Sequence, residues 1–214
     1  MMLLMSKDLC PEKALIFRII HRDNLDNVLA NGCLSRIAAR RQVGYVEIGN
    51  QELIAKRVAR EVPCSPFGTL SNYVPFYFTP YSPMLLNIKT GYSVPKKPMA
   101  EILILVSSLY SLQTNGVPFV FSDRHAYLRT AQFSSDLSDL DRISWDVLQR
   151  RDFKRDDTEK FEKYQAEALV FNQLPLSQLH GIMCYNTKAK NMVEQRAAQY
   201  GSDIKVVAES KWYL

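Results

Sequence analysis

Hydrophobic and polar positions alternate over residues 72–84, which read NYVPFYFTPYSPM. A period of two residues is the pattern of a β-strand that buries one face. Three prolines interrupt this stretch, and proline cannot donate a hydrogen bond to a neighbouring strand. We therefore predict a short strand with a rigid exit. Ser82 followed by Pro83 then predicts the N-cap and first residue of a helix.

Apolar runs elsewhere in the chain predict further strands. Residues 101–107 (EILILVS) form a near-continuous apolar run, which is typical of a central strand. Residues 164–171 (YQAEALVF) place small and branched side chains on one face, at positions 166, 168 and 170. The complete set of predicted strands adds residues 15–20, 117–122, 181–185 and 204–208.

Capping residues predict the helices between these strands. Asp23 is expected to cap a helix that stops at Gly32, and Asn50 to cap a helix over residues 51–60. Thr187 is the expected cap of a later helix. Many short strands with unevenly distributed helices favour an α+β fold. At 214 residues, a single domain with its own core is expected.

Composition narrows the class of protein. Hydrophobic residues make up 47% and charged residues 23% of the chain, as in ordinary globular proteins. The apolar runs are shorter than the roughly 20 residues that a membrane span needs, so we expect no membrane contact and a cytoplasmic location. Residues 1–13 have no cationic lead for a signal peptide. We expect them to form a flexible tail before a domain over residues 14–214.

Charge and cysteine usage limit the chemistry. The net charge is +5 and the isoelectric point is near 9.0. Cations cluster at residues 36–41, 56–60 and 150–155, where they could bind phosphates or simply form solvated faces. The four cysteines are scattered and lack metal-ligand spacing, so we expect structural thiols and no metal. Phosphate-binding loops, dinucleotide-binding glycine motifs and nucleophile elbows are missing from the sequence.

Two charged residues stand in apolar surroundings. Glu167 lies in the middle of the strand YQAEALVF, and a carboxylate there is costly unless it is paired or hydrogen-bonded. A functional carboxylate and a buried ion pair are both compatible with this position. Arg57 lies among the apolar positions of its helix, so it either extends to solvent or enters a pocket. Lys56 and Arg60 are close enough to be alternatives to Arg57.

Four stretches together resemble the DarT family of bacterial toxins. They are LIFRIIHRDN, the helix with Lys56 and Arg57, NYVPFYFTPYSPM and KYQAEALVF, in the order that the family has. The resemblance spans roughly residues 14–212 and is strongest to the thymidine-modifying branch. It implies an ADP-ribosyltransferase-like fold with mixed or antiparallel central sheets. It also implies an enzyme that attaches ADP-ribose from NAD to thymidine in single-stranded DNA.

The resemblance assigns roles to particular residues. NAD is the implied co-substrate, and no metal is implied. Glu167 is the expected catalytic carboxylate, with Arg57 and His125 beside it. A histidine such as His21, taken alone, is more often a packing or capping residue than a ligand, and the resemblance reverses this preference. The residues expected to contact NAD are His21, Arg22, Asp23, Asn24, Arg57 and Tyr77.

The acceptor strand is expected to contact a long polar segment, residues 133–155. In the ADP-ribosyltransferase fold the segment before the catalytic strand selects the acceptor. Unstacked bases are available in single-stranded DNA without the cost of base flipping, and aromatic rings can stack on them. The residues expected to contact DNA are Tyr73, Tyr81, Met84, Phe153, Lys154 and Arg155.

The resemblance also implies a protein partner, and two alternative functions stay open. DarT toxins are encoded beside a macrodomain antitoxin that removes ADP-ribose from DNA, so the resemblance implies such a partner. One rival is an NAD-consuming enzyme whose acceptor is protein or water. The other is a catalytically silent module that binds single-stranded nucleic acid.

Overall fold

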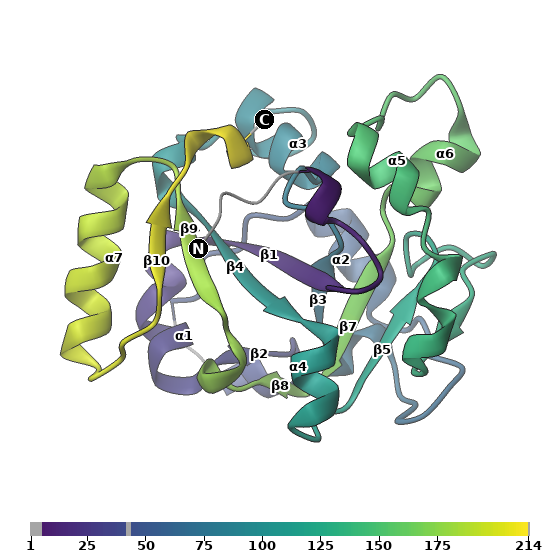
Figure 1. Cartoon of the computed structure of the whole chain (residues 1–214), viewed down its shortest axis with the longest axis horizontal. Coiled ribbons are helices and arrows are strands. Elements are labelled where there is room, and N and C mark those ends of the chain that lie inside the picture. The colour runs from purple at the N-terminus through teal and green to yellow at the C-terminus, as the bar shows by residue number, and fades with distance from the viewer. Residues whose placement is uncertain (1–5, 42–43, 214) are drawn as a thin grey trace.

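A computed structural model describes residues 6–41 and 44–213 as an α+β protein built on one large, mostly antiparallel sheet (Figure 1). The strand order is β10-β9-β4-β1-β3-β7-β5-β6, and only the pairing of β10 with β9 is parallel. A separate two-stranded ladder joins β2 and β8. The strands are β1 (Leu15–His21), β2 (Cys33–Leu34), β3 (Tyr73–Tyr77), β4 (Ile102–Ser108), β5 (Phe119–Ser122), β6 (Phe133–Ser134), β7 (Glu167–Phe171), β8 (Gln173–Leu174), β9 (Gly181–Cys184) and β10 (Val206–Ala208).

Helices surround the sheet and do not form a continuous layer. In Figure 1, α7 lies along β10 at one end of the sheet, and α5 and α6 lie at the other end. No helix in the described part of the chain is long and apolar enough to cross a membrane. The helices are α1 (Leu25–Asn31), α2 (Gln51–Arg57), α3 (Pro83–Thr90), α4 (Leu109–Thr114), α5 (Trp145–Arg150), α6 (Thr158–Lys163) and α7 (Thr187–Gln199).

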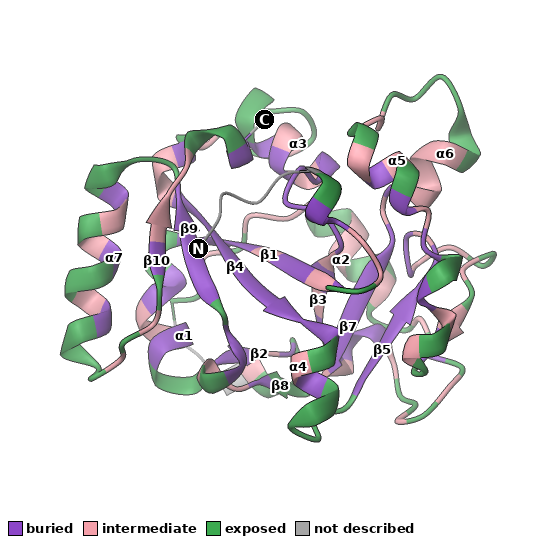
Figure 2. Ribbon diagram, in the orientation of Figure 1, coloured by how far each residue is buried: buried purple, intermediate pink, exposed green. Residues whose placement is uncertain are grey.

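The core is centred on β1 and β4. These strands pair in unbroken register from Leu15 opposite Ser108 to His21 opposite Ile102. Every residue of β4 is buried, as its continuous apolar run predicts (Figure 2). Burial of this apolar surface is the main favourable term in folding. The sheet therefore gives the neighbouring strands β3 and β7 a rigid support.

The strand β7 lies between β3 and β5. Its first residue, Glu167, is opposite Tyr77 of β3 and opposite Ser122 of β5. Side chains of directly opposed residues in antiparallel strands lie on the same face of the sheet. The register thus places the buried carboxylate beside a tyrosine.

The capping predictions are partly confirmed. The Ser82 hydroxyl accepts from Leu85 N at 3.2 Å, and Pro83 begins α3, as predicted. The prediction for Asp23 is wrong, because a short 3-10 turn intervenes and α1 starts after Asn24. Thr187 is also not a cap: the side chain of Asn186 accepts from the first turn of α7 and Thr187 is already helical.

Residues before β1 include a short 3-10 turn at Ser6–Asp8. Leu9 is 1% exposed, and its carbonyl accepts from Gln149 Nε2 of α5 at 2.9 Å. The described part of this segment therefore packs against the domain. The domain boundary at residue 14 and the flexibility of residues 1–13 stay predictions.

Candidate active site

Glu167 is held by a two-pronged ion pair inside the protein. Its side chain is 3% exposed. Arg57 Nη1 donates to Oε1 at 2.8 Å and Arg57 Nη2 donates to Oε2 at 2.7 Å. The backbone N–H of Ala126 donates to Oε1 at 3.0 Å. Parallel contacts of this kind match the planar guanidinium to the carboxylate and fix both groups in orientation.

The helix α2 positions Arg57. Asn50 Oδ1 accepts from Leu53 N at 2.9 Å and starts the helix, which ends at Arg57 and not near residue 60 as predicted. Lys56 pairs with Glu52 on the solvent side, and Arg60 Nη2 donates to the Leu128 carbonyl at 3.1 Å. Of the three neighbouring cations, the one that enters the site is therefore Arg57.

His125 approaches the same carboxylate. Its Nδ1 lies 3.2 Å from Glu167 Oε1, and Tyr127 N donates to that nitrogen at 3.2 Å. Burial lowers the pKa of His125, because charging the ring in this apolar setting is costly; the Glu167 charge opposes this and the Arg57 charge reinforces it. The ring is therefore neutral near pH 7.

The pKa of Glu167 is lowered. Burial on its own raises this pKa, but the charge of Arg57, the charge that His125 acquires in acid, and the hydrogen bonds from Arg57 and Ala126 N more than offset burial. The carboxylate is therefore ionised. An ion pair and a functional carboxylate were alternatives for this residue. The structure shows the ion pair, which keeps a buried negative charge in a fixed place, and the catalytic role of Glu167 remains a prediction.

Tyr77 completes the cluster on the neighbouring strand. Burial raises the pKa of its hydroxyl far above the usual value, with the Glu167 charge acting in the same direction. The charges of Arg57 and Arg18 act in the opposite direction. The hydroxyl therefore stays protonated and can donate a hydrogen bond.

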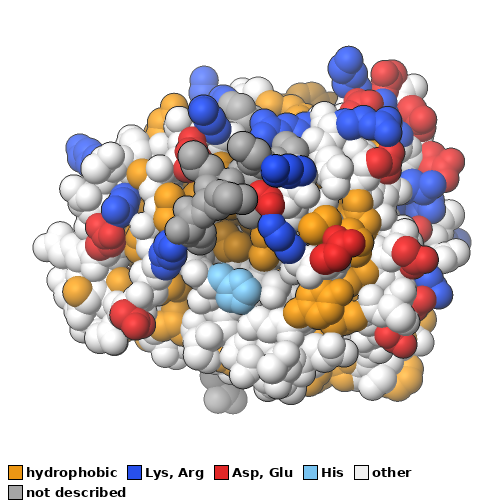
Figure 3. Space-filling view, in the orientation of Figure 1, with side chains coloured by type: hydrophobic (Ala, Val, Ile, Leu, Met, Phe, Trp, Pro, Cys, Tyr) orange, Lys and Arg blue, Asp and Glu red, His pale blue; other side chains and the backbone are white. Residues whose placement is uncertain are grey.

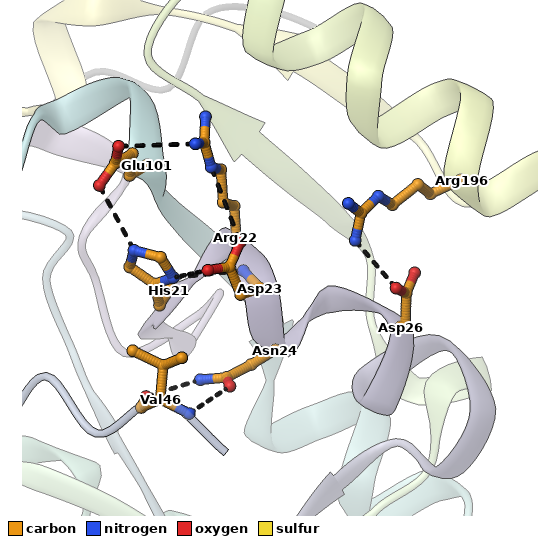
Figure 4. A network of polar contacts seen from close by, with 8 residues as sticks. All are labelled: His21, Arg22, Asp23, Asn24, Asp26, Val46, Glu101 and Arg196. Atoms are coloured by element: carbon orange, nitrogen blue, oxygen red, sulfur yellow. Dashed lines mark hydrogen bonds and ion pairs between the residues drawn. The ribbon is translucent and has the colours of Figure 1, made fainter. Parts of the chain in front are cut away.

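The residues after β1 form a separate polar network (Figure 4). His21 Nδ1 accepts from Asp23 N at 3.3 Å, and its Nε2 lies 3.4 Å from Glu101 Oε2. Arg22 also reaches Glu101, at 3.5 Å. The amide of Asn24 both donates to and accepts from the backbone of Val46, at 2.8 Å each way.

The four predicted NAD contacts at residues 21–24 differ in exposure: two of these side chains are buried and two are exposed. His21 and Asn24 are 5% and 1% exposed, and they shape the turn and the chain around Val46. Arg22 and Asp23 have side chains that are 45% and 54% exposed. Contact with NAD remains a prediction for all four residues.

Two tyrosines predicted to stack on DNA bases are buried. Tyr73 is 1% exposed and packs edge-on against Phe171, with ring centroids 5.3 Å apart. Tyr81 is 2% exposed, and the Arg151 guanidinium lies 3.6 Å from its ring centroid. Neither ring exposes a face to solvent in this structure, and the predicted stacking on DNA bases remains untested. Their aromatic surface stabilises the core and the loop around Arg151.

The other predicted DNA contacts lie nearer the surface. Phe153 is half-buried and its ring centroid is 5.1 Å from that of Tyr164. Lys154 and Arg155 are exposed, and Arg155 lies over the ring of Tyr92 at 5.0 Å. Met84 is half-buried on α3 and packs against the core. Their contact with DNA remains a prediction.

The sequence reasoning missed two features near the site. The Ala126 N–H has no sequence signal, because any residue but proline supplies it. Arg18 did have one: it interrupts the apolar strand LIFRIIH in the way that Glu167 interrupts its own strand. Within residues 6–41 and 44–213, no three His, Cys, Asp or Glu side chains group so as to hold a metal ion.

Comparisons with known proteins agree with this geometry. A family model described as "ssDNA thymidine ADP-ribosyltransferase, DarT" matches residues 17–214. A DNA ADP-ribosyl transferase of Escherichia coli O127:H6 is 46% identical over 98% of this chain and 97% of its own length. A Thermus sp. 2.9 DarT solved with ADP-ribosylated ssDNA is 32% identical, with a TM-score of 0.89 over 95% of this chain and 98% of the other.

A second structure of that Thermus protein, solved in complex with NAD+, has a TM-score of 0.82 and covers 95% of this chain and 99% of the other. A family model over residues 17–214 and a relative of 46% identity leave one assignment. The chain belongs to the DarT family of single-stranded-DNA thymidine ADP-ribosyltransferases.

Proposed function

We propose that Glu167, Arg57 and His125 carry out the reaction of the DarT family in this chain. ADP-ribose passes from NAD to a thymidine base in single-stranded DNA, and nicotinamide is released. Family membership supports the overall reaction, as do the NAD+ and ADP-ribosylated ssDNA complexes of the Thermus relative. The ionised, buried and firmly oriented carboxylate of Glu167 is the observation that carries the assignment of roles.

Glu167 stabilises the charge that develops on the ribose. As the bond between nicotinamide and the ribose breaks, its electron pair leaves with nicotinamide and the sugar becomes cationic. Oε1 accepts from Arg57 and Ala126, whereas Oε2 accepts from Arg57. Each carboxylate oxygen has about two acceptor positions. Oε2 therefore has a position left for the ribose 2′-hydroxyl, and its fixed charge needs no rearrangement during the reaction.

The thymine ring must lose a proton when its nitrogen attacks the sugar. The lowered pKa of Glu167 makes this carboxylate a weak base. His125 is neutral near pH 7 and adjoins Oε1, so it can accept the proton directly or position the base. Tyr77 keeps its proton and donates to the nicotinamide ribose.

Arg57 acts through Glu167. The resemblance predicts that Arg57 contacts NAD, and this contact remains a prediction. Both terminal nitrogens of Arg57 donate to the carboxylate. Its role in the proposal is to keep Glu167 ionised and to fix the direction in which the free position of Oε2 points.

The DNA strand crosses the surface near residues 153–155. Lys154 and Arg155 are exposed cations that contact phosphates, and Phe153 and Met84 supply apolar contact to bases. Single-stranded DNA is the favoured acceptor because its bases are already unstacked. The NAD adenosine lies against the turn at residues 21–24.

The biological setting follows the resemblance to DarT. The chain acts as a toxin in the cytoplasm, and a macrodomain antitoxin encoded beside it removes ADP-ribose from the modified DNA. The neighbouring gene is the direct check. A purified product of that gene should restore the mass of an ADP-ribosylated oligonucleotide to its unmodified value.

The decisive experiment incubates the protein with NAD and single-stranded oligonucleotides that differ only in their thymidines. Mass spectrometry should show one ADP-ribose on thymidine-containing strands and none on the others. Glu167→Gln should lower kcat by about 10²–10³-fold because the ribose cation loses its counter-charge. Glu194→Gln, on the exposed face of α7, is the matched control and should keep wild-type activity.

Three outcomes of this experiment would oppose the proposal. Modification independent of thymidine would contradict the substrate. NAD consumption with ADP-ribose found on protein or in water would support the rival acceptors. An active Glu167→Gln enzyme would contradict the role given to the carboxylate.

A further inference from the structure

Arg18 is a charged residue inside β1 that the reaction scheme above does not use. Its Nη1 donates to the Pro75 carbonyl of β3 at 2.8 Å. A guanidinium has five N–H donors in a planar arrangement. In the part of the chain that the structure describes, no carboxylate forms an ion pair with Arg18. A half-buried cation in a strand is costly without a counter-charge, which suggests that the counter-charge comes from a ligand.

Two other arginines near this part of the sheet are paired with carboxylates. Arg57 is paired with Glu167, and Arg22 is paired with Glu101 and Asp23. The charges of these arginines are therefore balanced within the protein. Arg18 is the arginine of this group whose charge is left for an anion.

Along β1, Arg18 lies between the residues that the proposed function assigns to the two ends of NAD. Its neighbour Phe17 is opposite Tyr77, the tyrosine beside Glu167. His21 ends the same strand three residues further on, roughly 10 Å away at 3.3 Å per residue. The diphosphate of NAD joins the two riboses and so lies between the two ends of the cofactor. Arg18 also lines a narrow pocket with Asn27 and Tyr45, and its charge acts on the hydroxyl of Tyr77.

We propose that Arg18 binds the diphosphate of NAD through the guanidinium N–H groups that its contact with Pro75 leaves over. The inference rests on the proposed function, since it deepens the assignment of the same site. Arginine suits this task because its planar donors match two phosphate oxygens at once. A diphosphate contact from Arg18 also explains how the site binds an anionic cofactor although Arg57 is paired with Glu167.

The test compares ADP with adenosine, which differ by the diphosphate alone. Isothermal titration should show that the wild-type protein prefers ADP. Arg18→Gln keeps a donor for the Pro75 carbonyl but removes the charge. The variant should lose about tenfold or more of its ADP affinity, whereas adenosine affinity stays within about twofold. The ADP affinity of Arg18→Lys should lie between that of the wild-type protein and that of Arg18→Gln. Arg196→Met, which removes a surface arginine paired with Asp26, is the control.

A purely structural role for Arg18 would lower both affinities together and leave the ADP-to-adenosine ratio unchanged. That result would overturn the inference. A measurement on the unmodified protein covers the case in which the variants do not fold: ADP, but not adenosine, should protect Arg18 from phenylglyoxal, read from the labelled peptide. Equal protection by both would also overturn it.

These outcomes are separable from those of the proposed function. If the wild-type protein modifies thymidine while Arg18→Gln keeps its ADP preference, only the present inference fails. If the wild-type protein does not modify DNA but Arg18→Gln loses the ADP preference, the diphosphate site stands and the acceptor assignment fails.

Discussion

At the scale of single residues, the ion pair of Glu167 and Arg57 decides the character of the site. Removing a carboxylate from water is costly. The attraction to a paired cation in the low-dielectric interior offsets this desolvation cost only when the geometry is good and further hydrogen bonds are present. Here two contacts below 3 Å and the Ala126 N–H meet that condition. The carboxylate is therefore kept ionised where water cannot screen its charge.

We expect the pair to be strongly coupled in stability. Arg57→Met leaves a buried, unpaired carboxylate and should lower the free energy of unfolding by about 3–5 kcal/mol. Adding Glu167→Gln to Arg57→Met should recover much of that loss, because no unpaired charge remains. Urea unfolding at pH 7 of both single variants and the double variant gives the coupling energy. Strictly additive losses would mean that the two groups do not depend on each other.

We expect His125 to make stability depend on pH. Its folded pKa is lowered from 6.5 chiefly by burial, so below about pH 6.5 the unfolded chain binds a proton that the folded histidine does not. The contribution is complete above that pH and is lost as pH falls toward the folded pKa. The difference in unfolding free energy between wild type and His125→Asn should therefore shrink from pH 7 to 5.5. A difference that stays constant would contradict a buried, neutral ring.

At the scale of elements, the site depends on the short helix α2. This helix has seven residues, and none of them is buried, so core packing does not hold it in place. Isolated helices of this length are unstable in water. Its N-cap and the ion pair at its last residue are the contacts that fix its two ends.

We expect loss of the Asn50 N-cap to lower catalytic efficiency although the cap contributes little to the stability of the whole protein. Asn50→Ala should cost about 1 kcal/mol of local stability, speed amide exchange in α2 and lower kcat/KM, because Arg57 loses its fixed position. Asn50→Asp should restore both readouts. Asn186→Ala removes the equivalent cap of α7, whose side chain accepts from Ala189 N at 2.9 Å. That control should lose stability and keep activity; equal effects of the two caps on activity would argue against the role of α2.

At the scale of the whole molecule, the distribution of charge over the surface bears on where DNA could bind. Figure 3 shows Lys and Arg side chains interspersed with acidic ones on the face that it presents, so this face has no uniform positive patch. The segment at residues 153–155 combines two exposed cations with a half-buried ring. Such a combination suits binding to a single strand.

We expect this segment to set the salt dependence of DNA binding. Lys154→Gln and Arg155→Gln should each weaken binding to single-stranded oligonucleotides and reduce the slope of log K against log[salt] by about 0.7, the value for one phosphate contact on a single strand. Fluorescence anisotropy at several salt concentrations measures both. Lys188→Gln, an exposed cation on α7, should leave the slope unchanged. An unchanged slope for the first two variants would place the strand elsewhere.

The sequence by itself determined most of the elements and the candidate catalytic residue. The apolar run at 101–107 is β4 shifted by one residue, and Asn50 and Ser82 start the helices that they were expected to start. Glu167 was recognisable because a carboxylate in an apolar strand violates a local rule, and local rules depend only on neighbouring residues. Asp23 and Thr187 failed as caps because the competing residues Asn24 and Asn186 are adjacent, and a pattern places helix ends only to within a residue or two.

Tertiary structure alone decided which side chains meet. Arg57 and Glu167 are 110 positions apart, and the choice of Arg57 over Lys56 or Arg60 depends on where α2 ends relative to β7. The burial of Tyr73 and Tyr81 depends on Phe171 and Arg151, which lie far from them in the chain. Local patterns carry no information about such partners, because long-range contacts are fixed by how strands pair and helices pack.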